Sequence, residues 1–302
     1  MNKRLSADRQ ALFFGLTAVL LWSTVATAFK LALREMDVFQ LLFYAVCSSA
    51  GILLLLVWRQ NKLPLILEYF KRHTAYFLSM GLLNPLVYYL VLLRAYDLLP
   101  AQQAQSINYT WAITLALMAV PLLGQKLSAK DLAAAVLGYS GVVVIATQGR
   151  FLDMQFDSLE GVIFALLSTF LWALYWILNT GNKRDPVVAL CVNFIVAMPF
   201  AFILCMGFSD LALPGWQALA SAVYVGLFEM GITFALWSTA LRLSSSVARM
   251  GNLIFLSPIL SLVFIATILG EVIHPATLIG LALIIPGVLL QQMPRPTVKA
   301  RG

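Results

Sequence analysis

Charge is scarce in this sequence. Charged residues occupy 11% of the 302 positions and hydrophobic residues 61%, whereas soluble domains carry roughly 25% charged residues. A chain of this composition cannot cover its apolar surface with polar groups in water. We therefore expect its surroundings to be lipid and the bilayer to be one of its partners.

Cysteine and histidine are also rare. The three cysteines, Cys47, Cys191 and Cys205, lie inside apolar stretches, and neither a CxxC pair nor a His/Cys cluster occurs. This pattern implies neither a disulfide framework nor a zinc site. No metal or other cofactor is predicted, and the cysteines are interpreted as packing residues.

Several functional motifs are missing. No Walker A sequence occurs, so an ATP-driven pump is excluded. HExxH is absent, and both histidines, His73 and His274, fall outside the apolar segments, which makes an intramembrane enzyme the least favoured class. The net charge of +7 is divided among the connections between apolar segments rather than gathered in one patch, so nucleic acid is not a predicted partner.

Apolar segments follow one another along the whole chain. A helix needs about 20 residues to cross roughly 30 Å of hydrocarbon. Ten segments meet this requirement, near residues 11–33, 38–58, 75–96, 100–123, 130–147, 159–180, 186–208, 216–240, 245–269 and 275–292. The sequence therefore predicts an all-α membrane protein of ten transmembrane helices.

Lysine and arginine predict the orientation of these helices. With the N-terminus inside, 15 of the 20 basic residues fall on the inner side, four on the outer side (Lys30, Arg34, Arg94 and Arg150), and Arg249 inside a span. Basic residues are enriched in cytoplasmic connections. Both termini are thus predicted to be cytoplasmic, in an inner (plasma) membrane of the bacterial type.

The two halves of the chain resemble each other. Residues 11–22 align without gaps to residues 161–172, and the alignment pairs Trp22 with Trp172. Further matches pair Gly81 with Gly226, Ala95 with Ala240, Gly124-Gln125 with Gly270-Glu271, and Gly141 with Gly287, at offsets of 145 to 150. Matches in the same order at nearly one offset indicate an internal repeat.

Each predicted repeat, 1–147 and 148–302, holds five spans. Because five is odd, the second repeat must run in the opposite orientation to the first. Inverted repeats are typical of alternating-access transporters, which bind their solute near the midplane between the halves. They also occur in channels, and this second class stays open at this point.

Local motifs are similar to those of a known family. They are Leu21-Trp22-Ser23-Thr24, Asn108-Tyr109-Thr110-Trp111, Gly124-Gln125-Lys126, Ser257-Pro258, Leu269-Gly270-Glu271, and the later Gly280 and Gly287. Together they resemble the drug/metabolite transporter superfamily, in its EamA branch, and within it amino-acid exporters of the YddG type. The first half departs from the pattern, with Ala112 where the second has Pro258 and Gln125 where it has Glu271. The resemblance implies ten helices around a central cavity and the export of amino acids or related metabolites.

The fourth span carries a polar stripe. Gln102, Gln105, Ser106 and Tyr109 share one helical face, with Asn108 and Trp111 beside it. Facing lipid, these groups would lack hydrogen-bond partners at a cost of a few kcal/mol each. The stripe therefore faces either the helix bundle or a water-filled cavity.

Aromatic residues form the second candidate group. Trp172 and Trp176 share one helical face, and Trp22 is the repeat counterpart of Trp172. The family resemblance implies that Trp22, Tyr109, Trp111 and Trp172 line the central cavity. Tyr88 and Tyr89 would complete an aromatic box, whose rings can bind an ammonium group.

Glu229 lies in the middle of the eighth span, where a carboxylate is costly unless it is protonated, paired or hydrated. It is a candidate proton-coupling site, a ligand of a substrate amine, or a structural partner of Arg249. Lys30, Arg94 and Glu271 lie near the outer ends of spans and are expected to be solvated or to snorkel.

The sequence thus predicts a monomeric secondary transporter that exports amino acids or similar small solutes. Export of drugs or organic cations is the alternative. The predicted substrate-binding residues are Trp22, Tyr88, Gln105, Asn108, Tyr109, Trp111, Trp172, Trp176 and Glu229.

Overall fold

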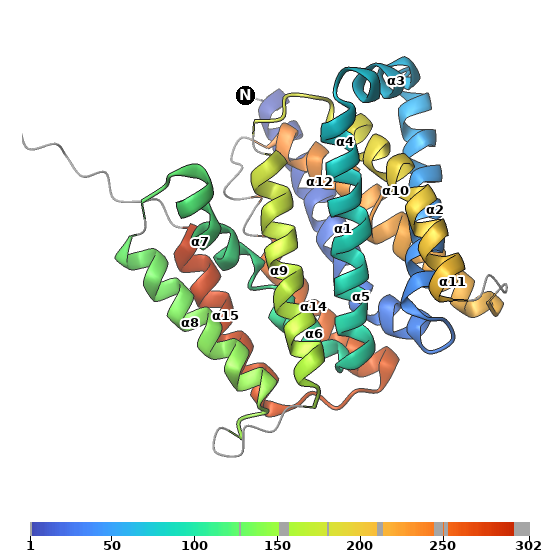
Figure 1. The fold of residues 1–302 in the computed structure, drawn as a ribbon. Helices are drawn as coiled ribbons and strands as arrows, with labels where there is room; N and C mark the ends of the chain where they lie inside the picture. The colour runs from blue at the N-terminus through green and yellow to red at the C-terminus, as the bar shows by residue number, and fades with distance from the viewer. Residues whose placement is uncertain are drawn as a thin grey trace, which may run out of the picture.

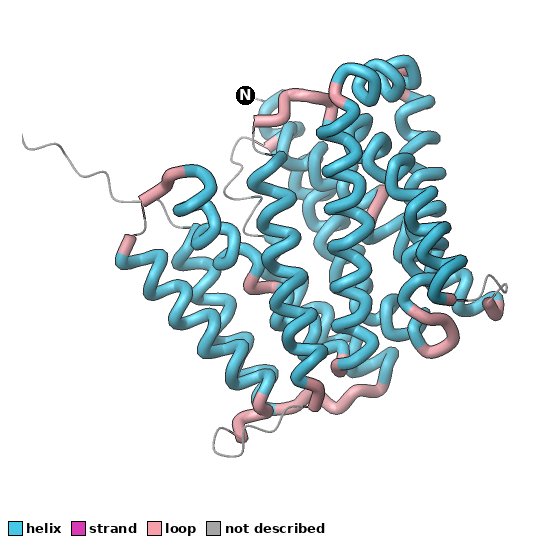
Figure 2. The backbone as a smooth tube through the Cα atoms, in the orientation of Figure 1, coloured by secondary structure: helices cyan, strands magenta, loops and turns pink. Residues whose placement is uncertain are grey.

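The computed structural model describes residues 2–126, 128–150, 157–179, 181–209, 214–244, 250 and 253–292. Within these ranges the chain is helical and contains no strand (Figures 1 and 2). Helices suit this composition because they satisfy every backbone N–H and C=O inside one segment, as hydrocarbon surroundings require.

The first half begins with two long helices and ends with a third. Its elements are α1 (Asn2–Leu33), α2 (Val38–Arg59), α3 (Leu63–Arg72), α4 (Thr74–Gly81), the π-helix η1 (Leu82–Val87), α5 (Tyr88–Leu98), α6 (Ala101–Asn108), α7 (Trp111–Leu123) and α8 (Ala129–Ala146). The predicted third span thus runs through α4, η1 and α5, and the fourth is divided at Tyr109–Thr110. The sequence had predicted the fourth as one continuous helix.

The second half of the chain is also helical. Its elements are α9 (Leu159–Asn179), α10 (Pro186–Phe208), α11 (Trp216–Tyr224), the π-helix η2 (Val225–Glu229), α12 (Ile232–Leu243), the 3₁₀ turn η3 (Leu253–Phe255), α14 (Leu256–Phe264), the π-helix η4 (Ile265–Leu269) and α15 (Pro275–Gln292). The start of the predicted ninth span, including Arg249, lies outside the described residues.

Eight helical segments of the described chain are long and apolar enough to cross a membrane. Two shorter apolar helices, Leu256–Leu269 and Pro275–Leu290, fall within the predicted ninth and tenth spans. Large apolar side chains also remain exposed on the outside of the bundle, for example Phe13 at 66% and Phe208 at 71%. Exposed apolar surface of this extent suits lipid contact rather than water.

The short helix α3 was missed in the sequence. It has no buried residue, and Leu63 and Leu67 are exposed, whereas Tyr69 and Phe70 pack against Phe77 of α4. Ten residues are too few to span a bilayer. The segment therefore gave no signal in a search for long apolar runs.

Helix pairs from different parts of the chain make the main contacts. α1 packs against α12 and α14, and α9 packs against α5 and α7. α2 packs against α10 at one edge of the bundle, and α8 against α15 at the other (Figure 1). We call the face of the bundle at which α1 begins the N-terminal face, and the face at which it ends the opposite face.

Glycines allow α8 and α15 to come together. A Cβ on Gly141 would lie 2.6 Å from the carbonyl oxygen of Gly280, and one on Gly280 would lie 2.7 Å from that of Gly141. Small residues at a membrane helix interface permit such close backbone approach. Gly124 and Gly270 instead end α7 and η4 in the left-handed region, with φ of 66° and 72°.

Candidate functional site

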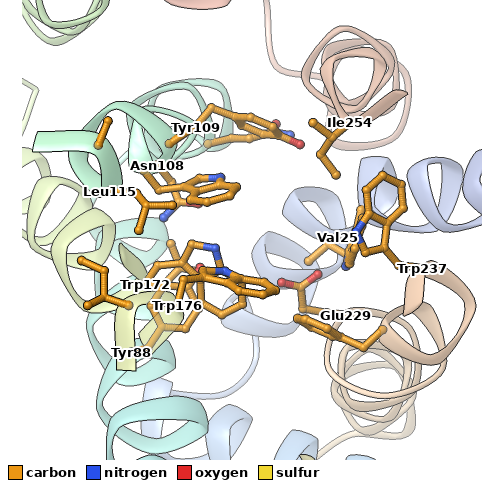
Figure 3. Close-up of a pocket in the computed structure, with 18 of the residues that line it drawn as sticks. Val25, Tyr88, Asn108, Tyr109, Leu115, Trp172, Trp176, Glu229, Trp237 and Ile254 are labelled. Carbon is orange, nitrogen blue, oxygen red and sulfur yellow. The ribbon is translucent and has the colours of Figure 1, made fainter. Parts of the chain in front are cut away.

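A cavity of about 660 Å³ lies in the middle of the bundle, between α1, α5, the α6–α7 segment, α9 and the η2–α12 segment. All nine residues predicted from the sequence line it. They are Trp22, Tyr88, Gln105, Asn108, Tyr109, Trp111, Trp172, Trp176 and Glu229. Residues far apart in the chain therefore meet at one space (Figure 3).

Trp172 stands at the centre of one aromatic cluster. Its ring stacks on Tyr88 with centroids 4.6 Å apart, and it meets Trp111 at 6.4 Å and Trp176 at 5.9 Å, both edge to face. Aromatic pairs favour these arrangements because their ring faces are negative and their edges positive. The cluster joins α5, α7 and α9 around the cavity.

A second aromatic cluster lies on the side of the cavity formed by α1 and α12. Trp22 of α1 meets Trp237 at 5.5 Å and Phe234 at 5.6 Å, both from α12. Phe234 also lies 6.1 Å from Trp172 and so connects the two clusters. Phe234 and Trp237 were not among the site residues predicted from the sequence. Their position, five and eight residues after Glu229 in the same predicted span, is the sequence feature that could have indicated them.

Glu229 is the acidic residue of the cavity lining. It ends the π-helix η2, and its Oε1 accepts a hydrogen bond of 3.1 Å from the hydroxyl of Tyr89. Figure 3 shows the carboxyl group directed into the cavity, across from Trp172 and Trp176. Tyr89 thus occupies one acceptor site of the Glu229 carboxyl group, and the remaining acceptor sites of that group face the cavity.

Amides of α6 add further polar groups. Asn108 Nδ2 donates to Ser168 Oγ of α9 at 2.8 Å, which fixes its orientation. Gln105 is 6% exposed, and its Oε1 has no hydrogen-bond partner among the described residues. A buried acceptor without a partner costs about 1–3 kcal/mol. This oxygen is closed off from the cavity, so only a rotation of the Gln105 side chain would bring it to a bound solute.

The cavity lining contains no lysine, arginine or histidine among the residues that the structure describes. Glu229 presents a carboxyl group to the cavity, and the aromatic rings present negative ring faces. This environment suits a cation or an ammonium group. Within the described ranges, no group of three or more His, Cys, Asp or Glu side chains is arranged to hold a metal ion.

The cavity is closed toward the opposite face. Phe29 and Tyr96, 1% and 4% exposed, form the end of the lining with ring centroids 5.0 Å apart. Just beyond them, Lys30 Nζ donates to the carbonyl oxygens of Tyr96 at 2.7 Å and Leu99 at 3.1 Å. Lys30 thus joins α1 to the end of α5. The sequence had predicted instead that this side chain is solvated or snorkels.

Glu271 adds to this closure. Its Oε1 accepts the backbone N–H of Ala101 at 3.0 Å, at the first residue of α6, where a helix leaves amides unpaired. Gln102 Oε1 accepts from the backbone N–H of His274 at 2.9 Å and from Thr277 Oγ1 at 2.8 Å. Glu271 therefore caps a helix, contrary to the expected solvated role. The polar stripe divides accordingly, with Gln102 facing the bundle and Gln105 and Tyr109 facing the cavity.

Toward the N-terminal face the cavity continues to the surface. Its lining includes exposed Leu123 and Gln125 at the end of α7. The side-chain hydrogen bonds of α7 run from Thr114 to Tyr139 of α8 and Thr169 of α9. Within the described ranges, none joins α7 to α12 or α14.

These features define an integral membrane protein with a solute-sized cavity that is closed at one end. The sequence matches the EamA-like transporter family over residues 9–147 and again over residues 159–291. The chain belongs to the EamA-like transporter family.

Relatives share most of its length. An uncharacterized transporter of Archaeoglobus fulgidus is 24% identical over 281 residues, which cover 90% of this chain and 93% of that protein. The aromatic amino acid exporter YddG of Ancylobacter novellus is 25% identical over 203 residues, 66% of this chain and 70% of that protein. A protein of known crystal structure, 21% identical, superposes with a TM-score of 0.67 over 93% of this chain and 95% of its own. This last likeness concerns the fold alone.

Proposed function

We propose that this protein is a secondary transporter that exports amino acids or related small amines by alternating access. The observation that carries the proposal is the central cavity, where the Glu229 carboxyl group faces an aromatic enclosure that lacks basic residues. A substrate ammonium group would bind this carboxyl group, and an apolar side chain would bind between Trp22 and Trp172. The similarity to the aromatic amino acid exporter of Ancylobacter novellus supports this substrate class.

Two similar halves favour alternating access, and several observations support an inverted repeat of residues 1–147 and 148–302. The contacts of α1 with α12 and α14 correspond to those of α9 with α5 and α7 when the halves are exchanged. The family match also covers two ranges, one in each half. Two halves that exchange conformations give inward-open and outward-open states of comparable energy.

Local backbone features recur at the repeat offset. Breaks at η1 and η2 interrupt the third and eighth spans; η1 contains the non-helical Asn84, which is the counterpart of Glu229 of η2 at an offset of 145. The left-handed glycines Gly124 and Gly270 end corresponding helices. Interruptions at matching positions support two copies of one design.

The closed end supports a transporter over a channel. At the opposite face Lys30 joins α1 to α5, and Glu271 and Gln102 join α6 to α15 and the segment before it, while the cavity reaches the N-terminal face at Gln125. With the N-terminal face cytoplasmic, as the basic residues predict, this is an inward-open state ready to receive solute. Gln125 is the repeat counterpart of Glu271, and we expect it to close the N-terminal face in the other state.

The test is transport by purified protein in liposomes, with a panel of amino acids, nucleosides and organic cations and with or without a pH gradient. Saturable amino-acid uptake with counterflow is the expected result. Single-channel currents, or uptake of none of the amino acids, would contradict the proposal.

Export of organic cations or drugs is the second candidate. One carboxylate in an aromatic cavity without basic residues would also hold a cation that has no carboxylate. Accumulation of cationic dyes without amino-acid transport in the same assay would favour it.

A further inference from the structure

A second cavity, of about 300 Å³, opens beside the first at the N-terminal face. It lies between α4, the end of α9, α10 and α12. Trp176, Phe234 and Trp237 line both cavities, so these three side chains form a shared wall. The second cavity runs from exposed Arg242 in the last turn of α12 to buried Asn193 of α10.

The charge of this cavity is opposite to that of the central one. Arg184 and Arg242 line it, and its described lining contains no aspartate or glutamate. Neither guanidinium lies in a salt bridge with any described residue, whereas nearby Lys62 is paired with Asp185 at 2.6 Å. Two positive groups thus face one space without a counter-ion.

Arg184 is held in place by neutral neighbours. Its Nη1 donates to Asn182 Oδ1 at 3.0 Å, and its guanidinium carbon lies 4.9 Å from the Tyr76 ring centroid and 5.6 Å from that of Phe77. Stacking on rings orients a guanidinium while leaving its other N–H donors available. A planar fork presented in this way matches a carboxylate, which it can bind through two parallel hydrogen bonds.

Basic residues at a cytoplasmic face are common in membrane proteins and usually meet water or lipid phosphate. Two features separate this pair from that role: both residues line a concave space, and that space shares its aromatic wall with the solute cavity. Asn193 adds a polar group at the deep end, where it is 4% exposed and its Oδ1 has no partner among the described residues.

We propose that the second cavity is an entry site that binds the carboxylate of the solute through Arg184 and Arg242. This inference rests on the proposed transport of amino acids. The two cavities then divide the recognition of the zwitterion. The arginines capture its carboxylate at the N-terminal face, and Glu229 receives its ammonium group once the solute reaches the central cavity, which is open at the same face. The arginines select solutes that carry an acid group, and the central cavity alone would accept any small aromatic amine.

The test compares an amino acid with its decarboxylated amine, for example phenylalanine with phenethylamine, as solutes of the liposome-reconstituted protein. In Arg184→Gln and Arg242→Gln we expect KM for the amino acid to rise about tenfold, the equivalent of about 1.4 kcal/mol, with kcat and all amine parameters unchanged. Arg184→Lys keeps the charge and loses the planar fork, so an intermediate KM is expected. Lys183→Gln, a neighbouring cation outside the lining, is the matched control.

Each other outcome has a separate meaning. If the wild-type protein transports no amino acid, the proposed function fails before the entry site is tested. If it transports both solutes and the arginine variants leave KM unchanged, or change both solutes equally, the entry site is wrong. An effect seen only in liposomes that contain anionic lipid, and equal for both solutes, would assign the arginines to lipid phosphate instead.

Discussion

The hydroxyl of Tyr89 donates a hydrogen bond of 3.1 Å to Glu229 Oε1 and so joins α5 of the first half to η2 of the second. Tyr89 is 1% exposed and does not line the cavity, whereas Glu229 does. The tyrosine therefore orients the carboxyl group from outside the cavity and leaves the other carboxyl oxygen without a bond from Tyr89. This pair connects the binding chemistry to the packing of the two halves.

Glu229→Gln should reduce transport of amine-bearing solutes by about 10- to 100-fold in kcat/KM. The reason is the loss of a charged hydrogen bond, worth about 1.5–3 kcal/mol, at about 1.4 kcal/mol per tenfold. Tyr89→Phe should give a smaller loss. Tyr224→Phe, which removes a hydroxyl bonded to Thr24 outside the cavity, should leave solute preference unchanged. Unaltered transport and pH dependence in Glu229→Gln would exclude this carboxylate from binding and coupling.

Gln102→Leu should weaken the closure at the opposite face. The variant loses the contacts of this amide with His274, Thr277 and Val272. An unpaired buried group costs about 1–3 kcal/mol, so the open population should rise roughly tenfold. Ala26→Cys, in the cavity lining, reports this opening through its reaction with an impermeant thiol reagent applied at the opposite face.

The labelling experiment requires replacement of Cys47, Cys191 and Cys205. Arg94→Gln is its control, because the ion pairs of Arg94 at the same face are exposed, and exposed pairs contribute only about 0–1 kcal/mol. Equal labelling of Ala26→Cys with and without Gln102→Leu would show that the amide does not hold this end closed.

Gly141→Ala and Gly280→Ala should each destabilise the protein by about 1–3 kcal/mol, because the added Cβ would overlap the facing backbone. Gly51→Ala in α2 is the matched control, since its Cβ meets nothing within 4 Å. It should be neutral or stabilising by up to about 1 kcal/mol, through higher helix propensity. Thermal unfolding in detergent measures all three, and equal melting temperatures would refute close α8–α15 packing.

Asp185 should make the protein sensitive to acid. Partial burial acts to raise the pKa of its carboxyl, but the Lys62 ammonium and the amides of Val188 and Val187 outweigh it, and the pKa lies below its ordinary value. A depressed pKa stabilises the fold above the unfolded-state pKa, near 4, and the stabilisation is lost as the pH falls through the folded-state value.

Two variants of Asp185 separate charge from capping. Asp185→Ala also removes the N-cap of α10, worth about 1 kcal/mol, whereas Asp185→Asn keeps a good cap and removes only the charge. Melting temperatures between pH 7 and about pH 3 should show a shallower acid loss in both variants. A wild-type slope that persists in Asp185→Asn would assign the acid sensitivity to another group.

Hydropathy predicted most helices closely because the bilayer fixes their length. The segment 186–208 coincides with α10, and 159–180 differs from α9 by one residue. The breaks at Tyr109–Thr110, η1 and η2 were not predicted, since they depend on which neighbours satisfy the backbone groups that a break frees. No local sequence signal carries that information, apart from Pro85 in η1.

The lining of the central cavity was predictable for a similar reason. Polar groups in an apolar span must face something other than lipid, and this argument found Gln105, Asn108 and Glu229. The same argument could not separate Gln102 from Gln105 on one helical face. What separates them is His274 and Thr277, which meet Gln102 from the far end of the chain. Phe234 and Trp237 were missed because an aromatic residue in an apolar span carries no such penalty.

The short helix α3 has a consequence for the depth of the bundle in its membrane. Its exposed leucines and its final Lys71 and Arg72 give it one apolar and one basic side, as in helices that lie at the boundary between acyl chains and headgroups. Because α3 joins α2 to α4, we expect it to lie along the membrane surface and to fix how deeply both helices sit. The arginine-lined cavity beside α4 would then open at headgroup level, where solutes arrive from water rather than from the hydrocarbon.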